Sequence, residues 1–253
     1  IKNFQKFIKK FSLPFVTTWA AQDICSHDDK NFYGSIGRHA YKSANVIAEQ
    51  ADLILTFGVR FSPKIISKKF GQNAKIVSVD IDKKELDHCL IKIDEKINMD
   101  LKIFFSRILK KKIKKDNNDW LKNCKKIKNK YFYDNNVKFK FKRKNFVDPY
   151  KFIDNFSQFL SSNSIVYTDA GCNLCWCMQA FKVKYGQRLI SAWGYSPMGY
   201  SVPAGIGGKI HNSKKPVYSL IGDGGLMINL QELQFIMKNN INLKIVVLDN
   251  RIY

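Results

Sequence analysis

The sequence predicts an α/β protein with two doubly wound parallel-sheet domains. Continuous apolar runs such as ADLILTF (51–57) and KIVSVDI (75–81) are typical of strands covered on both faces. Helical patterns separate these runs, and the same alternation resumes after a basic stretch. A repeated strand–helix order of this kind favours parallel sheets over hairpins.

The first domain is expected over residues 1–110 and is Rossmann-like. It opens with a short amphipathic helix, because Phe4, Phe7, Ile8 and Phe11 recur at i, i+3, i+4 and i+7. The further expected strands are 13–18, 51–57 and 75–81, and the further expected helices are 40–50 and 101–109.

Residues 111–147 are expected to form a basic, solvated linker that carries a helix near 120–131, because they are rich in Lys and Asn. The second domain is expected over 148–253, where Pro149 is well placed at a helix start. Its expected helices are 150–160 and 229–238, and its expected strands are 164–168, 217–221 and 243–248. The stretch 196–210 is rich in small residues, which predicts close backbone packing.

The net charge of +22 comes almost entirely from lysine, since only six of the 43 basic residues are Arg. This balance indicates a solvated face and disfavours specific nucleic-acid binding, which leans on Arg. The six cysteines form no disulfide framework in a chain of 253 residues, so we expect reduced thiols and a cytoplasmic location. No apolar run predicts a membrane span or a signal peptide. Because the chain begins with Ile1 rather than Met and stops at Tyr253, directly after an expected strand, we expect a fragment of a longer protein, truncated in its second domain.

The most informative segment is residues 221–253, IGDGGLMINLQELQFIMKNNINLKIVVLDNRIY. It predicts a strand, a glycine-rich turn, a helix and a second strand. Since parallel strands joined by a helix end at the same sheet edge, Asp223 and Asn250 should lie side by side there. Their oxygens suit Mg²⁺, and Gly222, Gly224 and Gly225 allow a diphosphate to approach the backbone. A helix N-cap role for Asp223 and a plain packing role for Gly225 are the alternatives.

These motifs resemble those of the thiamine diphosphate-dependent enzymes. The resemblance rests on GDG with a spacer of 25 residues before the closing Asn, on SAWGYSPMGYSVPAGIGG (191–208) and on TDAGCNLCW (168–176). Residues 37–61 and VSVDIDKKEL (77–86) resemble the central domain of acetolactate synthase large subunits. The resemblance covers nearly the whole chain and is weakest in the linker.

The resemblance implies thiamine diphosphate and Mg²⁺ as cofactors. The implied metal ligands are the side chains of Asp223 and Asn250 and the carbonyl of Ile252. Met198 would be the apolar wedge under the cofactor, although a plain core role is the alternative. The backbone at Ser196 and Met198 would hydrogen-bond the pyrimidine. Cys172 and Asn173 would lie in the turn that helps to bind the diphosphate.

The implied activity is decarboxylation of a 2-oxo acid, with pyruvate expected, followed by carboligation to a second carbonyl compound. The alternatives are a simple 2-oxo acid decarboxylase and a non-catalytic or regulatory cofactor-binding relative. The activating glutamate of the family lies in an N-terminal pyrimidine-binding domain that we expect to be absent here, so no catalytic residue is assigned and this chain alone should be inactive. The implied assembly is a homodimer or homotetramer.

Four departures from the family pattern bear on these expectations. Asp249 precedes Asn250 where the family usually has Asn-Asn, and Ser196-Pro197 replaces a turn that contains Gly. Cys172-Asn173 stands where Gln and His are common, which suggests a different substrate pocket. GVRFSPK (58–64) departs from the acidic and Arg pattern that serves FAD, so FAD binding is left open.

Overall fold

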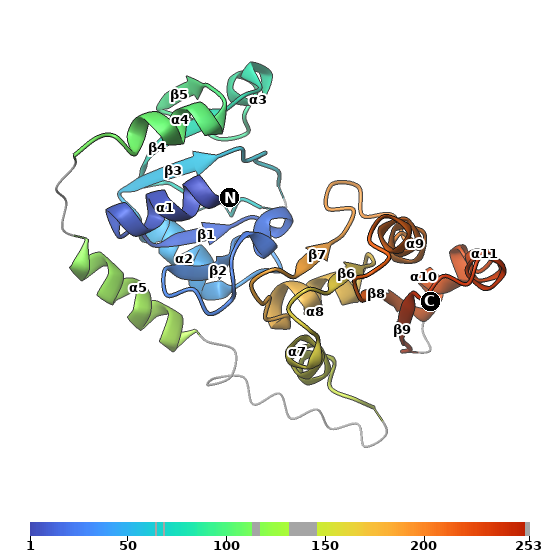
Figure 1. The fold of residues 1–253 in the computed structure, drawn as a ribbon. Coiled ribbons are helices and arrows are strands. Elements are labelled where there is room, and N and C mark those ends of the chain that lie inside the picture. Colours follow the sequence, from blue (N-terminus) through green and yellow to red (C-terminus); the bar gives the residue numbers. More distant parts are fainter. Residues whose placement is uncertain (64, 68, 113–116, 132–145, 251–253) are drawn as a thin grey trace. The chain divides into compact units, whose positions relative to one another are not determined.

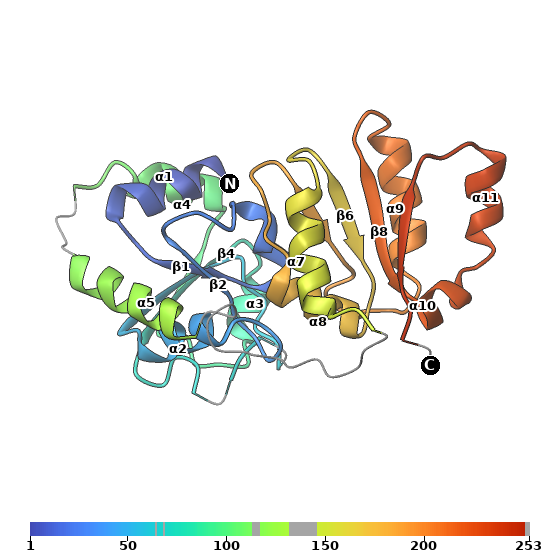
Figure 2. The same cartoon turned by 90° about the horizontal axis from the view of Figure 1, so that it is seen from below.

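The computed structural model describes residues 1–63, 65–67, 69–112, 117–131 and 146–250. The chain divides into two compact units, unit 1 (Ile1–Thr18 and Lys30–Lys140) and unit 2 (Trp19–Asp29 and Phe141–Tyr253). Every strand pairing in the described residues is parallel. The predicted α/β class with parallel sheets is therefore confirmed, and Figures 1 and 2 show the two units.

Unit 1 holds two parallel sheets, ordered β1-β2 and β3-β4-β5, where the sequence predicted a single sheet. The strands are β1 (Phe15–Thr17), β2 (Phe32–Ser35), β3 (Leu53–Phe57), β4 (Lys75–Asp80) and β5 (Glu95–Asn98). The helices are α1 (Lys2–Phe11), α2 (Lys42–Gln50), α3 (Lys83–Asp87), α4 (Leu101–Ile108) and α5 (Asn118–Lys130).

Aromatic packing joins α1 and α4 to the end of β3. The ring of Phe57 lies 5.0 Å from that of Phe105 and 5.7 Å from that of Phe7, and Phe7 and Phe105 are both buried. Clustered rings of this kind contribute beyond their buried area through edge-to-face geometry. The amphipathic helix predicted from the phenylalanine spacing is therefore a core element of unit 1.

Helix α5 differs from the expectation of a solvated linker. It packs against α2, with Cys124 fully buried and Ile127 only 7% exposed in a cluster with Tyr33 and Ile47. Burial raises the pKa of the Cys124 thiol to about 12. The lysines that suggested a solvated segment cover one face of α5, while its apolar face completes the core of unit 1.

Unit 2 contains one parallel sheet of order β7-β6-β8-β9. The strands are β6 (Ile165–Thr168), β7 (Arg188–Ile190), β8 (Val217–Gly222) and β9 (Lys244–Leu248). The helices are η1 (Trp19–Ile24), α7 (Pro149–Phe159), α8 (Cys172–Ala180), α9 (Ser201–His211), α10 (Asp223–Ile228) and α11 (Glu232–Lys238). Helices α7 and α8 lie on one face of the sheet, and α9 and α11 lie on the other (Figure 1).

The segment Trp19–Asp29 belongs to unit 2, although it was predicted to be part of the first domain. Asp23 Oδ2 accepts hydrogen bonds from Arg188 Nε at 2.6 Å and from the backbone N–H of Leu189 at 3.1 Å. The N–H of His27 donates to the carbonyl of Val183 at 2.8 Å. Contacts so distant in sequence leave no local pattern that could have predicted them.

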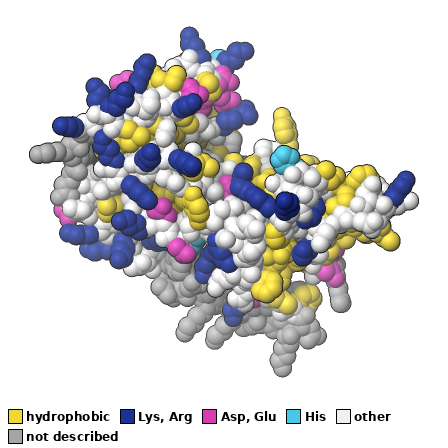
Figure 3. Space-filling model, viewed as in Figure 1, with side chains coloured by type: hydrophobic (Ala, Val, Ile, Leu, Met, Phe, Trp, Pro, Cys, Tyr) yellow, Lys and Arg dark blue, Asp and Glu magenta, His cyan; other side chains and the backbone are white. Residues whose placement is uncertain are grey.

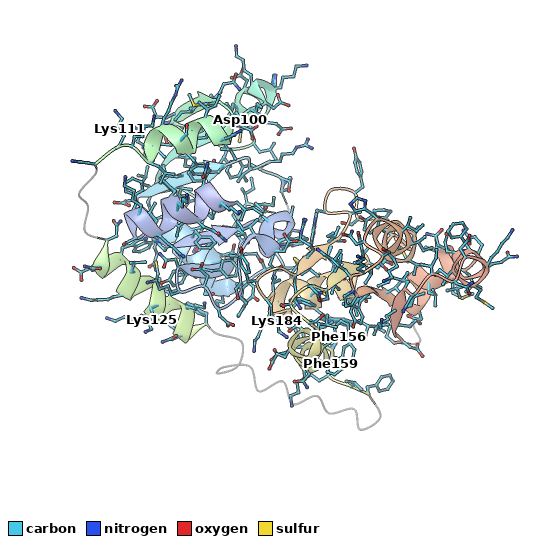
Figure 4. All side chains as sticks on the ribbon, viewed as in Figure 1. Asp100, Lys111, Lys125, Phe156, Phe159 and Lys184 are labelled. Carbon is cyan, nitrogen blue, oxygen red and sulfur yellow. The ribbon has the colours of Figure 1, made fainter. Side chains whose placement is uncertain are left out.

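Side chains form hydrogen bonds with backbone groups at both ends of α7. Asp148 accepts from the backbone N–H of Tyr150 at 2.9 Å, which caps the helix start at the predicted position. At the other end, Lys184 Nζ donates to the carbonyls of Gln158 and Leu160, both at 2.6 Å (Figure 4). A lysine at a helix C-terminus also complements the helix dipole.

The surface of the described residues is predominantly basic, as the composition predicts. Figure 3 shows Lys and Arg side chains scattered over unit 1 and interspersed with Asp and Glu, with hydrophobic side chains exposed on unit 2. Exposed apolar residues on α10 and α11 include Met227, Phe235 and Met237. No helix in the described part of the chain combines the length and apolar character needed to cross a bilayer.

Most of helix α9 lies in the stretch 196–210, and its small residues allow close contact with the sheet. A Cβ at Gly208 would lie 2.6 Å from Cε2 of Tyr167 on β6, whereas a Cβ at Gly207 would meet nothing within 4 Å. The predicted close packing is therefore confirmed at Gly208 but not at the adjacent Gly207, which is exposed.

We predict that Gly208→Ala destabilises the protein by about 1–3 kcal/mol, because the added methyl group forces Tyr167 to move. The matched control is Gly207→Ala, which should be neutral or stabilising by up to about 1 kcal/mol through helix propensity. Chemical denaturation of both variants measures the difference, and equal midpoints would contradict this packing.

Candidate functional site

The register of β8 and β9 brings the two predicted side-chain metal ligands to one edge of the sheet. Gly222, the last residue of β8, lies opposite Leu248, the last residue of β9, in a parallel pair. Asp223 follows β8 directly, and Asn250 stands two residues beyond Leu248. Both therefore lie at the carboxyl edge, where open α/β sheets bind ligands. The third predicted ligand, Ile252, lies outside the described residues.

Asp223 is the first residue of α10 and is half-buried, while Asn250 is exposed. Asp223 makes no side-chain cap for this helix, whose N-cap is Gly222, so the alternative reading of Asp223 as an N-cap is not supported. No group of three or more His, Cys, Asp or Glu side chains in the described residues is arranged to hold a metal. A cation beside Asp223 would therefore depend on amide and carbonyl oxygens, which suits Mg²⁺ with phosphate and water completing its octahedron.

The three glycines at the end of β8 differ in how closely they are packed. Gly225 is buried, and a Cβ there would overlap Oδ2 of Asp169, so close packing already requires this glycine. A Cβ at Gly222 would make ordinary contact with the Asn173 side chain at 3.8 Å. Gly224 stays half-exposed at the surface of the turn. The backbone near Asp223 is therefore approachable from the sheet edge.

Cys172 and Asn173 form the start of α8 at this same edge. The N-cap of α8 is Gly171, with a φ of +80°, and no side chain caps the first turn. Cys172 is exposed, whereas Asn173 is 5% exposed and its Nδ2 donates to the carbonyl of Ala170 at 3.3 Å. The uncapped N–H groups of a helix start favour an anionic ligand.

The loop before α9 carries Ser196 and Met198. Ser196 has a φ of +49°, which lies in the left-handed region that favours glycine, at the turn where the family pattern has Gly. Met198 is 48% exposed, which excludes the alternative reading of a core residue within unit 2. The side chain is therefore available to a ligand.

Two residues that the sequence analysis did not single out connect this loop to the glycine turn. Asp169 follows β6 directly and is 2% exposed, and Asn229 ends α10. Both make hydrogen bonds to Gly199, the residue after Met198. A carboxylate directly after a buried strand was the available signal for Asp169, and it lies within the TDAGCNLCW motif.

The residues present fit a metal-diphosphate group. One carboxylate and one amide stand at the same sheet edge, an uncapped helix start lies beside them, and the intervening backbone is glycine. Hard oxygen donors and free N–H groups are the complementary chemistry for Mg²⁺ and phosphate oxygens.

Comparisons with known proteins agree with this chemistry. The family model described as "Thiamine pyrophosphate enzyme, central domain" matches residues 1–108. The model described as "Thiamine pyrophosphate enzyme, C-terminal TPP binding domain" matches residues 169–253. The second match includes Asp169, the loop before α9, and the glycine turn.

Curated relatives match along nearly the whole chain. The acetolactate synthase large subunit of Lactococcus lactis subsp. lactis (strain IL1403) is 31% identical over 98% of this chain and 42% of its own length. Acetolactate synthase isozyme 1 large subunit of Escherichia coli (strain K12) is 28% identical over 97% of this chain and 43% of its own length. The chloroplastic acetolactate synthase 1 of Nicotiana tabacum is 27% identical over 99% of this chain and 38% of its own length.

The chain spans about two fifths of the length of these relatives. The two domain matches agree in order with the two units of the fold, and both come from the same family. The chain belongs to the thiamine pyrophosphate enzyme family and comprises its central domain and its C-terminal TPP binding domain.

Proposed function

We propose that the intact protein binds thiamine diphosphate and Mg²⁺, decarboxylates a 2-oxo acid such as pyruvate, and joins the product to a second carbonyl compound. The single observation that carries the proposal is the β8–β9 register, which sets Asp223 and Asn250 at one sheet edge beside a glycine turn. The acetolactate synthase relatives support carboligation over simple decarboxylation.

Each segment of the site has a defined part in this proposal. Asp223, Asn250 and the carbonyl of Ile252 would hold Mg²⁺. The start of α8 and the backbone of the glycine turn would bind the diphosphate through N–H groups. Ser196 would contact the pyrimidine through its backbone, and the exposed Met198 would pack under the cofactor. When bound, thiamine diphosphate supplies a nucleophilic thiazolium carbon and an electron sink for decarboxylation.

The local geometry supports the cofactor part of the proposal despite the departures in sequence. Ser196 has a left-handed φ of +49°, a backbone conformation that glycine adopts readily. Asn173 is buried beside Gly222 rather than exposed to substrate, whereas its neighbour Cys172 is exposed. The change from Gln-His to Cys-Asn therefore alters the exposed group at the start of α8 to a thiol.

We expect the intact protein, supplied with pyruvate, Mg²⁺ and thiamine diphosphate, to form acetolactate. Product analysis separates the alternatives: acetaldehyde as the main product would indicate a simple decarboxylase. Cofactor binding without pyruvate consumption would indicate a non-catalytic relative. Either of these two results would contradict the proposed carboligation.

Removal of the Asp223 carboxylate should weaken Mg²⁺-dependent binding of thiamine diphosphate about tenfold or more, because the ion loses its anionic ligand. Calorimetry of Asp223→Asn in the intact protein measures this loss. Asp249→Asn is the matched control, since it removes a carboxylate one residue from Asn250 and should change the affinity by less than about threefold. Equal effects of the two variants would argue against Asp223 as a ligand.

Thiol labelling provides a second test of the diphosphate position. Cys172 is exposed, whereas Cys177 is fully buried and burial raises its pKa to about 12. Iodoacetamide at neutral pH should therefore label Cys172 and spare Cys177. Pyrophosphate with Mg²⁺ should slow the labelling of Cys172, as followed by mass spectrometry of the peptide. Labelling at an unchanged rate under saturating ligand would exclude contact between the diphosphate and the start of α8.

A further inference from the structure

Gly199 is held from both sides by side chains of two other segments. Its backbone N–H donates to Asp169 Oδ2 at 2.9 Å, and its carbonyl accepts from Asn229 Nδ2, also at 2.9 Å. Each partner is 30 residues away in sequence. The single peptide segment between Met198 and α9 is therefore fixed by the end of β6 and by the end of α10.

The space around Gly199 leaves no room for a side chain. Its φ is +79°, and a Cβ there would lie 2.7 Å from Asn229 Nδ2 and 3.1 Å from the carbonyl oxygen of Gly225. The loop therefore lies directly on the glycine turn, with Asn229 across the contact. No larger residue could keep both hydrogen bonds and this approach.

Asp169 also contacts the glycine turn directly. Its backbone N–H donates to the carbonyl of Leu220 at 2.9 Å, which continues the β6–β8 ladder by one residue. A Cβ at Gly225 would overlap Asp169 Oδ2, so the carboxylate occupies the space that this glycine leaves. One buried side chain thus touches the loop 196–199 through Gly199 and the turn 222–225 through Gly225.

The Asp169 side chain is buried and accepts a hydrogen bond from the backbone instead of facing solvent. Burial raises the pKa of its carboxyl group, and the backbone N–H groups of Gly199, Ala170, Ser201 and Tyr200 oppose that increase. The start of α9 is anchored separately, since Ser201 Oγ lies 2.8 Å from Ser219 Oγ and both residues are fully buried.

We propose that Asp169 and Asn229 are positioning residues that fix the distance between the loop 196–199 and the glycine turn 222–225. This inference rests on the proposed function, in which the loop contacts the pyrimidine and the turn contacts the diphosphate. A ligand that spans both segments binds only when their separation is correct. The affinity for a ligand that touches the turn alone should not depend on this separation.

The test compares two ligands on the intact protein by calorimetry in the presence of Mg²⁺. Asn229→Ala should weaken thiamine diphosphate binding about threefold to tenfold, which corresponds to the loss of one hydrogen bond. The same variant should bind inorganic pyrophosphate within about twofold of the unmodified protein. A purely structural role would change both affinities together or neither, and either result would overturn the proposal.

The chain offers a matched control. Asn239 ends α11 as Asn229 ends α10, and its Nδ2 also donates to a backbone carbonyl, that of Phe235, at 2.9 Å. Asn239→Ala removes the same kind of hydrogen bond away from the loop and should leave both affinities unchanged. A loss of thiamine diphosphate affinity in Asn239→Ala equal to that in Asn229→Ala would also overturn the proposal.

Variants of Asp169 decide the question if Asn229→Ala does not fold. Asp169→Asn keeps an oxygen that can accept from Gly199 N–H and should retain thiamine diphosphate affinity, whereas Asp169→Ala should lose it selectively. Equal affinities of these two variants would contradict a positioning role. If the unmodified protein itself binds pyrophosphate but not thiamine diphosphate, the proposed function fails, which is a different result from failure of the positioning proposal.

Discussion

The parallel register of β6, β8 and β9 is the constraint on which the site depends. Because parallel strands end at the same edge, each strand delivers its following residue to one place: Asp169 after β6, Asp223 after β8, and the Asp249-Asn250 pair after β9. A slip of one residue in the β8–β9 pair would turn side chains to the opposite face of the sheet. Helices cover both faces of this sheet, with α7 and α8 on one side and α9 and α11 on the other (Figure 1).

Close backbone contact is the second requirement of this arrangement. Gly208 lets α9 approach Tyr167 on β6, Gly225 accommodates the Asp169 carboxylate, and Gly199 fits beneath Asn229. Each position lacks room for a Cβ because of the neighbours packed against it. The small residues of unit 2 thus bring the loop before α9 and the glycine turn into contact, and the proposed cofactor would reach both.

Much of this fold follows from periodicity and apolar runs. The strands at 51–57, 75–81, 164–168 and 217–221 and the helix at 101–109 were predicted within two residues of their observed bounds. The edge elements were harder to predict, because β5 (Glu95–Asn98) is too polar and β7 (Arg188–Ile190) is too short to give a pattern. Helix α9 was not predicted as a helix because Pro203 and three glycines lie within it, and packing against β8 outweighs their low helix propensity.

The site shows the same division between local signals and long-range contacts. The GDG turn and the spacer before Asn250 could be read from the sequence, because a strand–helix–strand segment places the residues that follow its two parallel strands at the same sheet edge. The partners of Gly199 could not, because a side chain 30 residues away leaves no periodic trace. The same holds for the segment 19–29, which reaches β7 through Asp23 and Arg188.

We propose that Asp223 and Asn250 share one cation at the edge of the unit 2 sheet. A crystal structure of the intact protein grown with Mg²⁺ and thiamine diphosphate would locate this ion. We predict one ion with Oδ atoms of both residues at about 2.1 Å. An ion that binds the diphosphate without either side chain, or that lies at the opposite edge of the sheet, would show that these residues do not form the metal site.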